Sequence, residues 1–276
     1  MFSKNIFQVW FQGCDKITRP EYLQNIKNWK MLNPNWKYAC LGDSELRQAC
    51  ATFSQECLNT YDYFDIMHLK IDFGRYVVLY LNGGIYADMD AYAMRSLDSS
   101  VHVQELIEKS KTGFHVLGLS MINMDVLESL VTVGYTHTIN NAIMMATPRN
   151  PVLKDFIETI IAKAQVNNTY YMSSIKVNVL TGPLHFNRYF KPLIEHPPDG
   201  NYIQVFDNQV FEPCKMNNCN ITKNTISIHE MELSWVSKNV KMAHDGYYAI
   251  KNYLPLLLIV PLIYIFIRLQ YCRCRR

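Results

Sequence analysis

Two aspartates one residue apart, Asp88 and Asp90, are the residues of this chain best suited to chemistry. They follow a short apolar run, residues 85–87, that is typical of a buried strand. Side chains two apart on a strand point to the same face, so we expect both carboxylates on one side. Hard carboxylate oxygens suit Mg²⁺ or Mn²⁺ better than zinc, and such a cation commonly binds substrate phosphate as well. The pattern therefore predicts a divalent-metal site with an anionic ligand.

A charged pair interrupts the helix that precedes this strand. Residues 69–82 carry apolar side chains at helical spacing, and Gly83 and Gly84 follow, where a helix commonly ends in a left-handed residue. Asp72 and Arg75 lie three apart and so share one helix face. Taken alone they are an ordinary ion pair, which contributes about 0–1 kcal/mol when exposed. Charges are costly to bury unless they are paired, so a pair in an apolar helix beside two aspartates indicates a binding site.

The rest of the chain alternates strands with helices, which predicts an α/β sheet rather than a sandwich. We expect strands at residues 6–10, 36–41, 114–119, 142–146, 202–206 and 225–228. We expect helices at residues 20–32, 43–58 with Asp43 as its cap, one or two within 61–82, and one at 152–164. Ligands of α/β sheets gather at the carboxyl ends of the strands, and Trp10 lies at such an end.

Composition excludes some classes of protein. A net charge of +3 over 276 residues, without a basic stripe interleaved with aromatics, argues against a nucleic-acid partner. Eight cysteines without a C-x-x-C pair argue against structural zinc. Cys214 and Cys219 are spaced to close a small disulfide, or they remain free buried thiols.

The C-terminal segment differs in composition from the rest. Residues 253–267 (YLPLLLIVPLIYIFI) contain no charge, and a basic tail follows. Fifteen helical residues span about 22 Å, and residues 252–271, with Arg268 reaching the interface, approach the ~30 Å of a hydrocarbon core. We therefore predict a domain at 1–246 and a transmembrane anchor with a short tail at 247–276; the alternative is a buried C-terminal helix.

The orientation of this anchor stays open. No signal peptide precedes the domain, which indicates a cytosolic domain, whereas the basic tail favours a cytoplasmic C-terminus. Both readings predict a single-pass membrane protein.

Several motifs together resemble a known family. They are residues 6–12 (IFQVWFQ), 33–38 (NPNWKY), 70–90 (KIDFGRYVVLYLNGGIYADMD), 140–146 (NNAIMMA), 181–183 (TGP) and 229–235 (HEMELSW). In this order they resemble the OCH1-like, DXD-containing sugar transferases of glycosyltransferase family 32, which include inositol phosphoceramide mannosyltransferases and α-1,4-glycosyltransferases. The resemblance implies a GT-A type, Rossmann-like fold that uses nucleotide-diphospho-sugars.

The resemblance also implies roles for single residues. Asp88 and Asp90 would hold Mn²⁺ or Mg²⁺, and His229 would complete the metal or diphosphate site. Asp72 and Arg75 would bind the donor sugar or its phosphates, where a planar guanidinium is well suited.

Four further residues receive roles in the same way. Trp10 would stack on the nucleotide base, and Trp235 would close over the diphosphate. Asn140 or Asn141 would face the reacting carbon, which fits a retaining reaction without a carboxylate nucleophile. For both tryptophans the alternative is ordinary core packing.

The function implied is metal-dependent, retaining transfer of a hexose (mannose, galactose or glucose) from GDP-mannose or a UDP-hexose to a lipid or glycan acceptor, at an endomembrane such as Golgi or ER. Two alternatives are kept. One is a DxD phosphotransferase, although such enzymes have threonine or valine where Tyr92 stands and carry the motif near the first strand. The other is a catalytically inactive, membrane-anchored glycan-binding protein.

Overall fold

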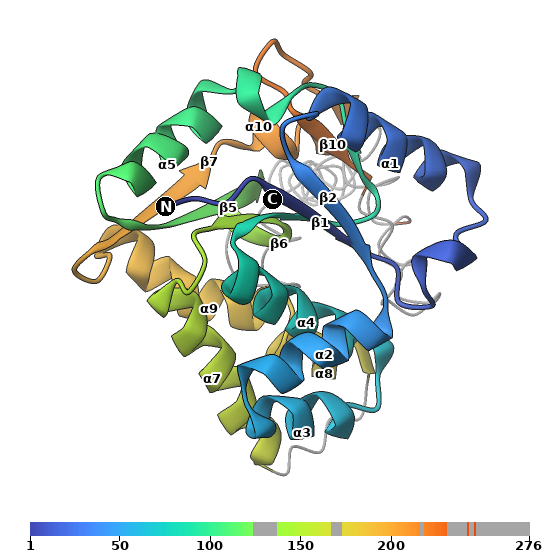
Figure 1. Ribbon diagram of the computed structural model, residues 1–276, viewed down its shortest axis with the longest axis vertical. Helices are drawn as coiled ribbons and strands as arrows, with labels where there is room; N and C mark the ends of the chain where they lie inside the picture. The colour runs from blue at the N-terminus through green and yellow to red at the C-terminus, as the bar shows by residue number, and fades with distance from the viewer. Residues whose placement is uncertain (124–136, 167–172, 216–217, 231–241, 243–245, 247–276) are drawn as a thin grey trace, which may run out of the picture. The chain divides into compact units, whose positions relative to one another are not determined.

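The centre of the structure is a six-stranded sheet with the strand order β2-β1-β3-β6-β5-β7 (Figure 1). Every strand is parallel to the others except β6, which runs antiparallel to both of its neighbours. The strands are β1 (Asn5–Val9), β2 (Lys37–Leu41), β3 (Gly84–Ala87), β5 (His115–Asn123), β6 (His137–Ala146) and β7 (Asn201–Phe206). The computed structural model describes residues 1–123, 137–166, 173–215 and 218–230, with Met242 and Gly246. Those up to residue 230 belong to one unit, Met1–Glu232.

Helices cover both faces of this sheet, as Figure 1 shows. One face carries α1 (Pro20–Leu32), α5 (Val101–Lys111) and α10 (Asn208–Phe211). The other carries α2 (Asp43–Phe53), α3 (Gln55–Tyr63), α4 (Met67–Asn82), α7 (Pro151–Gln165), α8 (Ser173–Leu180) and α9 (Pro183–Glu195). Largely parallel sheets need both faces covered, because their strands are apolar on both sides. The predicted α/β class is confirmed.

The strand predictions are confirmed with one systematic error. Strands β5 and β6 are longer than expected, because the prediction stopped at polar residues. Ser120, Thr138 and Asn140 lie inside these strands and are buried, since their polar groups find partners within the protein. A register shift between Leu119 and Ser120 accompanies the longer pairing.

The prediction of a single helix at residues 43–58 is wrong. The first helix, α2, ends at Phe53. The hydroxyl of Ser54 accepts a hydrogen bond from the Cys57 amide (3.1 Å) and so caps a second helix, α3. Asp43 is the first helical residue instead of the cap. The N-cap is Gly42, whose amide donates to the Glu45 carboxylate (2.9 Å).

The small elements bring the far end of the domain to the acidic pair. Strand β4 (Ala91–Ala93) pairs antiparallel with β10 (Ser227–His229), which sets His229 opposite Ala91. Strand β10 begins two residues later than the predicted strand at 225–228. The remaining short elements are β8 (Cys214–Lys215), β9 (Asn218–Cys219) and two 3-10 turns, η1 (Cys14–Lys16) and η2 (Leu97–Ser99).

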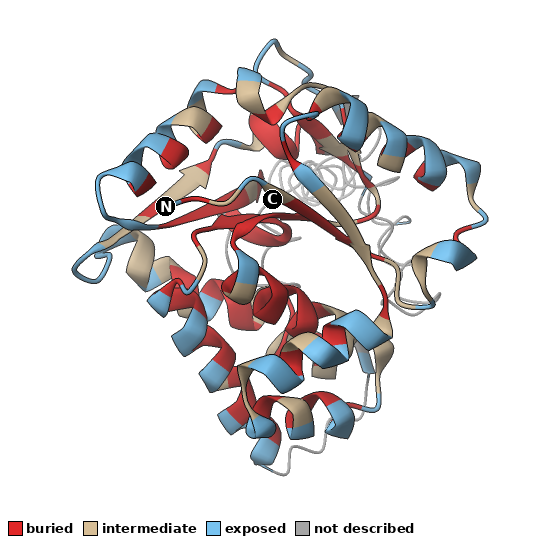
Figure 2. Cartoon of the chain, viewed as in Figure 1, coloured by how far each residue is buried: buried red, intermediate tan, exposed pale blue. Residues whose placement is uncertain are grey.

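The core lies between the sheet and the inner faces of the helices (Figure 2). Helix α1 contributes polar anchors as well as apolar area. Asn25, fully buried, donates to the carbonyls of Met89 (3.0 Å) and Ala91 (2.9 Å) and accepts from the Ala93 amide (3.1 Å). The indole of Trp29 also donates to Ala91 (2.9 Å). Helix α1 thus holds the segment on either side of Asp90.

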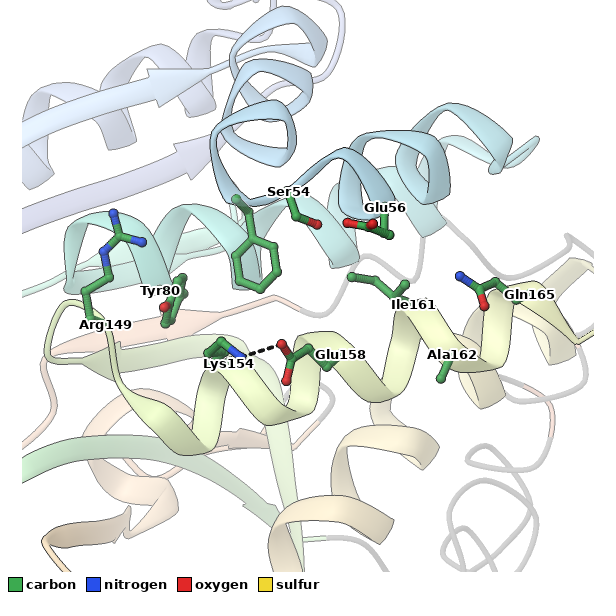
Figure 3. A pocket seen from close by; sticks show the side chains of 10 residues that line it. Ser54, Glu56, Tyr80, Arg149, Lys154, Glu158, Ile161, Ala162 and Gln165 are labelled. Carbon is green, nitrogen blue, oxygen red and sulfur yellow. Dashed lines mark hydrogen bonds and ion pairs between the residues drawn. The ribbon is translucent and has the colours of Figure 1, made fainter.

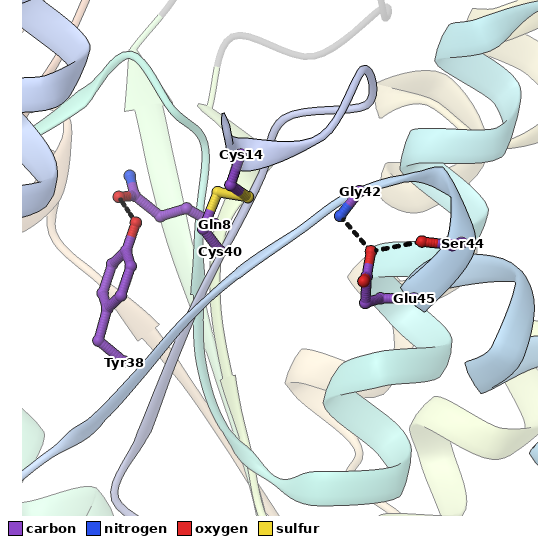
Figure 4. The surroundings of a disulfide bond; sticks show 7 residues. All are labelled: Gln8, Cys14, Tyr38, Cys40, Gly42, Ser44 and Glu45. Atoms are coloured by element: carbon purple, nitrogen blue, oxygen red, sulfur yellow. Dashed lines mark hydrogen bonds between the residues drawn. A yellow bond between two sulfur atoms is a disulfide. The ribbon is translucent and has the colours of Figure 1, made fainter. Parts of the chain in front are cut away.

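Four cysteines form two disulfides. Cys214–Cys219 is the pair that the sequence offered as one alternative, whereas Cys14–Cys40 was not foreseen. Figure 4 shows Cys14–Cys40 joining the segment after β1 to the end of β2. Cys50 and Cys57 are free and buried.

The predicted anchor at 253–267 lies outside the described residues. Within the part of the chain that the structure describes, no helix combines the length and the apolar character needed to cross a membrane.

Candidate active site

The turn between α4 and β3 needs both of its glycines. Gly83 ends the helix with φ 63°, and its amide donates to the Leu79 carbonyl (2.8 Å). A Cβ on Gly83 would lie 2.5 Å from Cδ of Pro148, and one on Gly84 (φ 111°) would lie 2.4 Å from the Asn5 carbonyl oxygen. The tight turn lets β3 pair directly with β1, which places the residue after β3 at the carboxyl end of neighbouring parallel strands.

Arg75 joins the helix to the acidic pair. Its Nη2 lies 2.8 Å from Asp72 Oδ1, its Nη1 lies 3.0 Å from Asp88 Oδ1, and Nη1 also donates to the Asn141 carbonyl (3.1 Å). The guanidinium stacks over the Tyr86 ring at 4.7 Å. The side chains of Asp72 and Arg75 are only 10% and 8% exposed, so they belong to a buried network and are not an ordinary exposed ion pair.

Asp88, Asp90 and His229 form a group suited to a metal ion. One ligand atom from each lies within 4.8 Å of the others. The sequence prediction that strand geometry aligns the two aspartates is wrong in its reason: β3 ends at Ala87, and Asp90 belongs to the turn closed by the Ala91 amide and the Asp88 carbonyl (3.0 Å). The turn, instead of a strand, brings the carboxylates together.

Burial and neighbouring charges shift the pKa values of Asp72, Asp88 and His229. Burial raises the pKa of Asp72 to about 6, against the opposing effect of Arg75. The pKa of Asp88 is also raised, by burial first and then by the charge of Asp90. Burial would lower the pKa of His229, but two carboxylates, Glu212 and Asp90, outweigh it and raise that pKa well above its ordinary value. Perturbed pKa values of this kind cluster at functional sites.

The two predicted asparagines enter separate networks. Asn141 donates to Asp72 Oδ1 (3.3 Å) and to the Tyr76 hydroxyl (2.8 Å). Asn140, adjacent on β6, donates instead to the Glu212 carboxylate (2.9 Å). The TGP motif at residues 181–183 also reaches the site, because the Thr181 hydroxyl donates to Asp72 Oδ2 (3.2 Å).

Trp10 packs beside the acidic turn. It lies edge-on to Tyr22 (5.4 Å between ring centroids) in a small cluster that includes Met89, the residue between the two aspartates. Its Nε1 is buried without a hydrogen-bond partner among the described residues. Trp235, predicted to cover the diphosphate, lies outside those residues.

Three residues that contact the site were not predicted from the sequence. The Gln8 amide donates to the Asp88 carbonyl (2.9 Å), the Tyr86 hydroxyl donates to Asp88 Oδ1 (2.6 Å), and Glu212 contacts His229 Nδ1 (2.8 Å). Gln8 lies in the IFQVWFQ motif and Tyr86 in the strand before Asp88, so both carried a signal. Glu212 stands alone in the sequence and carried none.

A groove of about 510 Å³ lies on the helical face, apart from this site (Figure 3). None of the predicted site residues lines it. Its walls come from α2, α3, α4 and α7, and Lys154 and Glu158 form an ion pair along it. The lining residues are Phe53, Ser54, Glu56, Tyr80, Arg149, Lys154, Glu158, Ile161, Ala162 and Gln165.

An α/β sheet with paired aspartates at the end of a buried strand, tied to a buried Asp–Arg pair, defines a DXD-type site. Residues 20–111 match the model of the family described as "Glycosyltransferase sugar-binding region containing DXD motif". The match includes Asp72, Arg75, Asp88 and Asp90, the residues that the sequence analysis selected first.

Curated relatives carry related names. The chain is 30% identical to an initiation-specific α-1,6-mannosyltransferase of Candida albicans, over 42% of this chain and 31% of that protein. It is 27% identical to the putative glycosyltransferase HOC1 of Saccharomyces cerevisiae, over 58% and 39%. It is 26% identical to an uncharacterised glycosyltransferase, L373, of Acanthamoeba polyphaga mimivirus, over 79% and 76%. The chain thus spans between three and four tenths of the first two relatives.

Proposed function

We propose that this chain is a metal-dependent, retaining glycosyltransferase with a GT-A type catalytic domain. It transfers a hexose from a nucleotide diphosphate sugar to a lipid or glycan acceptor. The observation that carries this proposal is the Asp88–Asp90–His229 group joined through Arg75 to the buried Asp72. The family match over residues 20–111 favours sugar transfer over the phosphotransferase alternative.

The residues at the acidic turn fit a divalent cation. Asp88 uses Oδ1 for Arg75 and Tyr86, so its Oδ2 is available to a metal beside Asp90 and His229. Two carboxylates and one imidazole suit Mn²⁺ better than Mg²⁺, which prefers oxygen ligands alone. The chemistry supplied by a bound divalent ion is neutralisation of the charge on the departing nucleoside diphosphate.

We assign the buried network of Asp72 and Arg75, next to the acidic turn, as the donor-sugar site. A sugar hydroxyl both donates and accepts hydrogen bonds. Asp72 can accept from such a hydroxyl and Arg75 can donate to one. Arg75 Nε is buried without a hydrogen-bond partner in the described part of the chain, which supports a role for a ligand oxygen there. Trp10 is our candidate for the base contact, because its cluster includes the residue between the aspartates.

A retaining outcome is proposed from the groups on β6. Asn141 lies against Asp72 and offers an amide, not a free carboxylate, to the reacting carbon; Asn140 is the second candidate. The relatives that are named mannosyltransferases support mannose, and hence GDP-mannose, as the first donor to test. Analysis of the product anomer by NMR checks the stereochemistry.

The disulfides support an extracytoplasmic catalytic domain. Cys14–Cys40 and Cys214–Cys219 are bonds that persist in oxidising compartments. With a basic C-terminal tail on the cytoplasmic side, the domain would face the lumen of an endomembrane compartment. Of the two orientations left open by the sequence, the disulfides therefore support the one with a cytoplasmic tail.

The test is donor turnover by the full-length chain with Mn²⁺, across GDP-mannose and a set of UDP-hexoses. We expect Asp90→Asn to reduce turnover by at least about 100-fold, because metal ligation supplies several kcal/mol of charge stabilisation. The matched control is Asp62→Asn, which removes a carboxylate from an exposed ion pair with Arg47. Full transfer by Asp90→Asn in EDTA would contradict the metal assignment, and glycan binding without hydrolysis of any donor would favour the inactive binding protein.

A further inference from the structure

Glu212 is a buried carboxylate at the centre of a polar chain. Its side chain is fully buried, just after α10. Oε2 lies 2.8 Å from His229 Nδ1, and Oε1 accepts from Asn140 Nδ2 (2.9 Å) and, at 3.5 Å, from the Ser120 hydroxyl. None of these partners, and no other described partner of Glu212, is a lysine or arginine. A buried acid with this set of partners needs a reason to be there.

A backbone amide fixes the direction of every hydrogen bond in this chain of contacts. The Ala142 N–H is a permanent donor, and it donates to Asn140 Oδ1 (3.2 Å). The amide group of Asn140 therefore turns its NH₂ toward Glu212, whose Oε1 accepts. The other carboxylate oxygen also accepts, so His229 must carry its proton on Nδ1.

The consequence appears at the opposite ring nitrogen. His229 Nε2 faces Asp90 Oδ1 at 3.3 Å, inside the proposed metal group. Because Glu212 holds one proton on Nδ1, a cation would displace the proton on Nε2, and Nε2 is the nitrogen that offers it a lone pair. We infer that Glu212 is a positioning residue that orients the imidazole of His229 toward the metal and, through the same carboxylate, fixes the Asn140 amide. This inference rests on the proposed function for its metal.

An isosteric substitution separates positioning from simple packing. Glu212→Gln keeps the shape but converts one acceptor into a donor. If the new NH₂ faces Asn140, two donors collide, and Asn140 cannot turn because Ala142 holds its oxygen. The favoured arrangement points the NH₂ at His229, which moves the imidazole proton from Nδ1 to Nε2 and blocks the ligating nitrogen.

The first experiment measures Mn²⁺ affinity of the full-length chain by calorimetry, with the metal alone as the probe. Loss of an outer-shell partner weakens metal binding by about 10–100-fold, and we expect Glu212→Gln to fall in that range. His229→Ala should weaken binding as well, and Glu212→Gln added to His229→Ala should change it no further. The matched control is Glu45→Gln, the same change in the first turn of α2, where the carboxylate accepts from the N-cap amide; this variant should bind like wild type.

Two outcomes would overturn the positioning role. One is wild-type affinity in Glu212→Gln. The other is an equal loss from Glu212→Gln with and without His229, which would mean that the carboxylate acts on the fold and not through the imidazole.

A second measurement needs no metal. At a pH high enough for the His229 ring to carry a single proton, nitrogen-15 NMR of the histidine side chains should find that proton on Nδ1 in wild type and on Nε2 in Glu212→Gln. An unchanged proton position would reject the inference, even if His229→Ala fails to fold. Absence of Mn²⁺ binding in wild type would instead count against the proposed metal site, while the proton position still decides the role of Glu212.

Discussion

Asp72→Asn should make the protein more stable at pH 8 while impairing its activity. Asp72 is buried, and its pKa is raised from 3.8 to about 6 even with Arg75 beside it. Each pKa unit corresponds to about 1.4 kcal/mol, so the ionised carboxylate disfavours the folded state by about 3 kcal/mol above pH 7. Asparagine resembles the neutral acid and avoids this cost.

The surroundings can accept the amide without leaving a group unpaired. The new oxygen accepts from Arg75 and Asn141, as Asp72 Oδ1 does now. The new NH₂ faces the Thr181 hydroxyl, which can turn to accept. Arg75 keeps its second carboxylate partner, Asp88, so no charge is left buried alone.

The pH dependence gives the prediction its sign. The folded state holds the Asp72 proton more tightly than the unfolded state, so this group stabilises the fold fully below about pH 4 and loses that contribution as pH rises through 6. Relative to Asp72→Asn, the free energy of unfolding of wild type should therefore fall by about 3 kcal/mol as pH rises across this window. Below about pH 4 the pH-dependent contribution of Asp72 should be complete, and the two proteins should not differ in it. For a domain of this size the gap at pH 8 corresponds to about 6–12 °C in Tm.

Urea denaturation of both proteins between pH 4 and 8 measures the difference, and donor turnover measures the cost. We expect turnover to fall by at least about 10-fold, since an amide oxygen cannot accept as many ligand hydroxyls as a carboxylate. The control, Asp62→Asn, should change stability in the opposite direction by less than about 1 kcal/mol, because Arg47 lowers the pKa of that exposed acid. An Asp72→Asn protein that is less stable than wild type at pH 8 would refute the reasoning, because attraction to Arg75 would then outweigh burial.

Arg75→Lys should weaken donor affinity, since one ammonium cannot span two carboxylates and a carbonyl. Donor affinity and Tm equal to those of wild type would instead mean that Asp72 and Arg75 are only an intrahelical ion pair. Gly84→Ala should cost more than about 2 kcal/mol in urea denaturation, because it adds a backbone clash to the strain of a positive φ, whereas Gly113→Ala, with open space around it, should cost about 1 kcal/mol. Deletion of residues 247–276 should give a detergent-free domain that still hydrolyses its donor but loses more efficiency with a membrane lipid than with a soluble acceptor. An insoluble truncation, alongside full-length protein that stays soluble without detergent, would overturn the anchor.

The parts of the site that are local in sequence were predictable. Asp72 and Arg75 share a helix face, and Asp88 and Asp90 follow a short apolar run that the preceding glycines mark as a strand. These features depend on neighbours a few residues away, and the sequence contains all of them. Helix α1 was predicted to the residue for the same reason, since Pro20 fixes its start.

The contacts that cross the fold were not predictable. Glu212 and His229 meet because β10 pairs with β4, a register that no local pattern encodes. Polar residues such as Asn140 end a strand in a hydrophobicity profile, yet they continue β6 because buried partners satisfy them. Cys14 and Cys40 likewise become neighbours only through the pairing of β1 with β2.

The Cys14–Cys40 disulfide affects how strand β2 can detach from the sheet. Strand β2 is an edge strand, the kind of element that frays and exposes unpaired amides. Cys40 lies opposite Gln8 near the carboxyl end of β2, so the disulfide pins this edge at the end that adjoins the site. Opening should therefore start from the Lys37 end and stop short of the candidate site. Hydrogen exchange along β2 should be graded, fast at Lys37 and slow at Leu41, and reduction of the bond should remove that gradient.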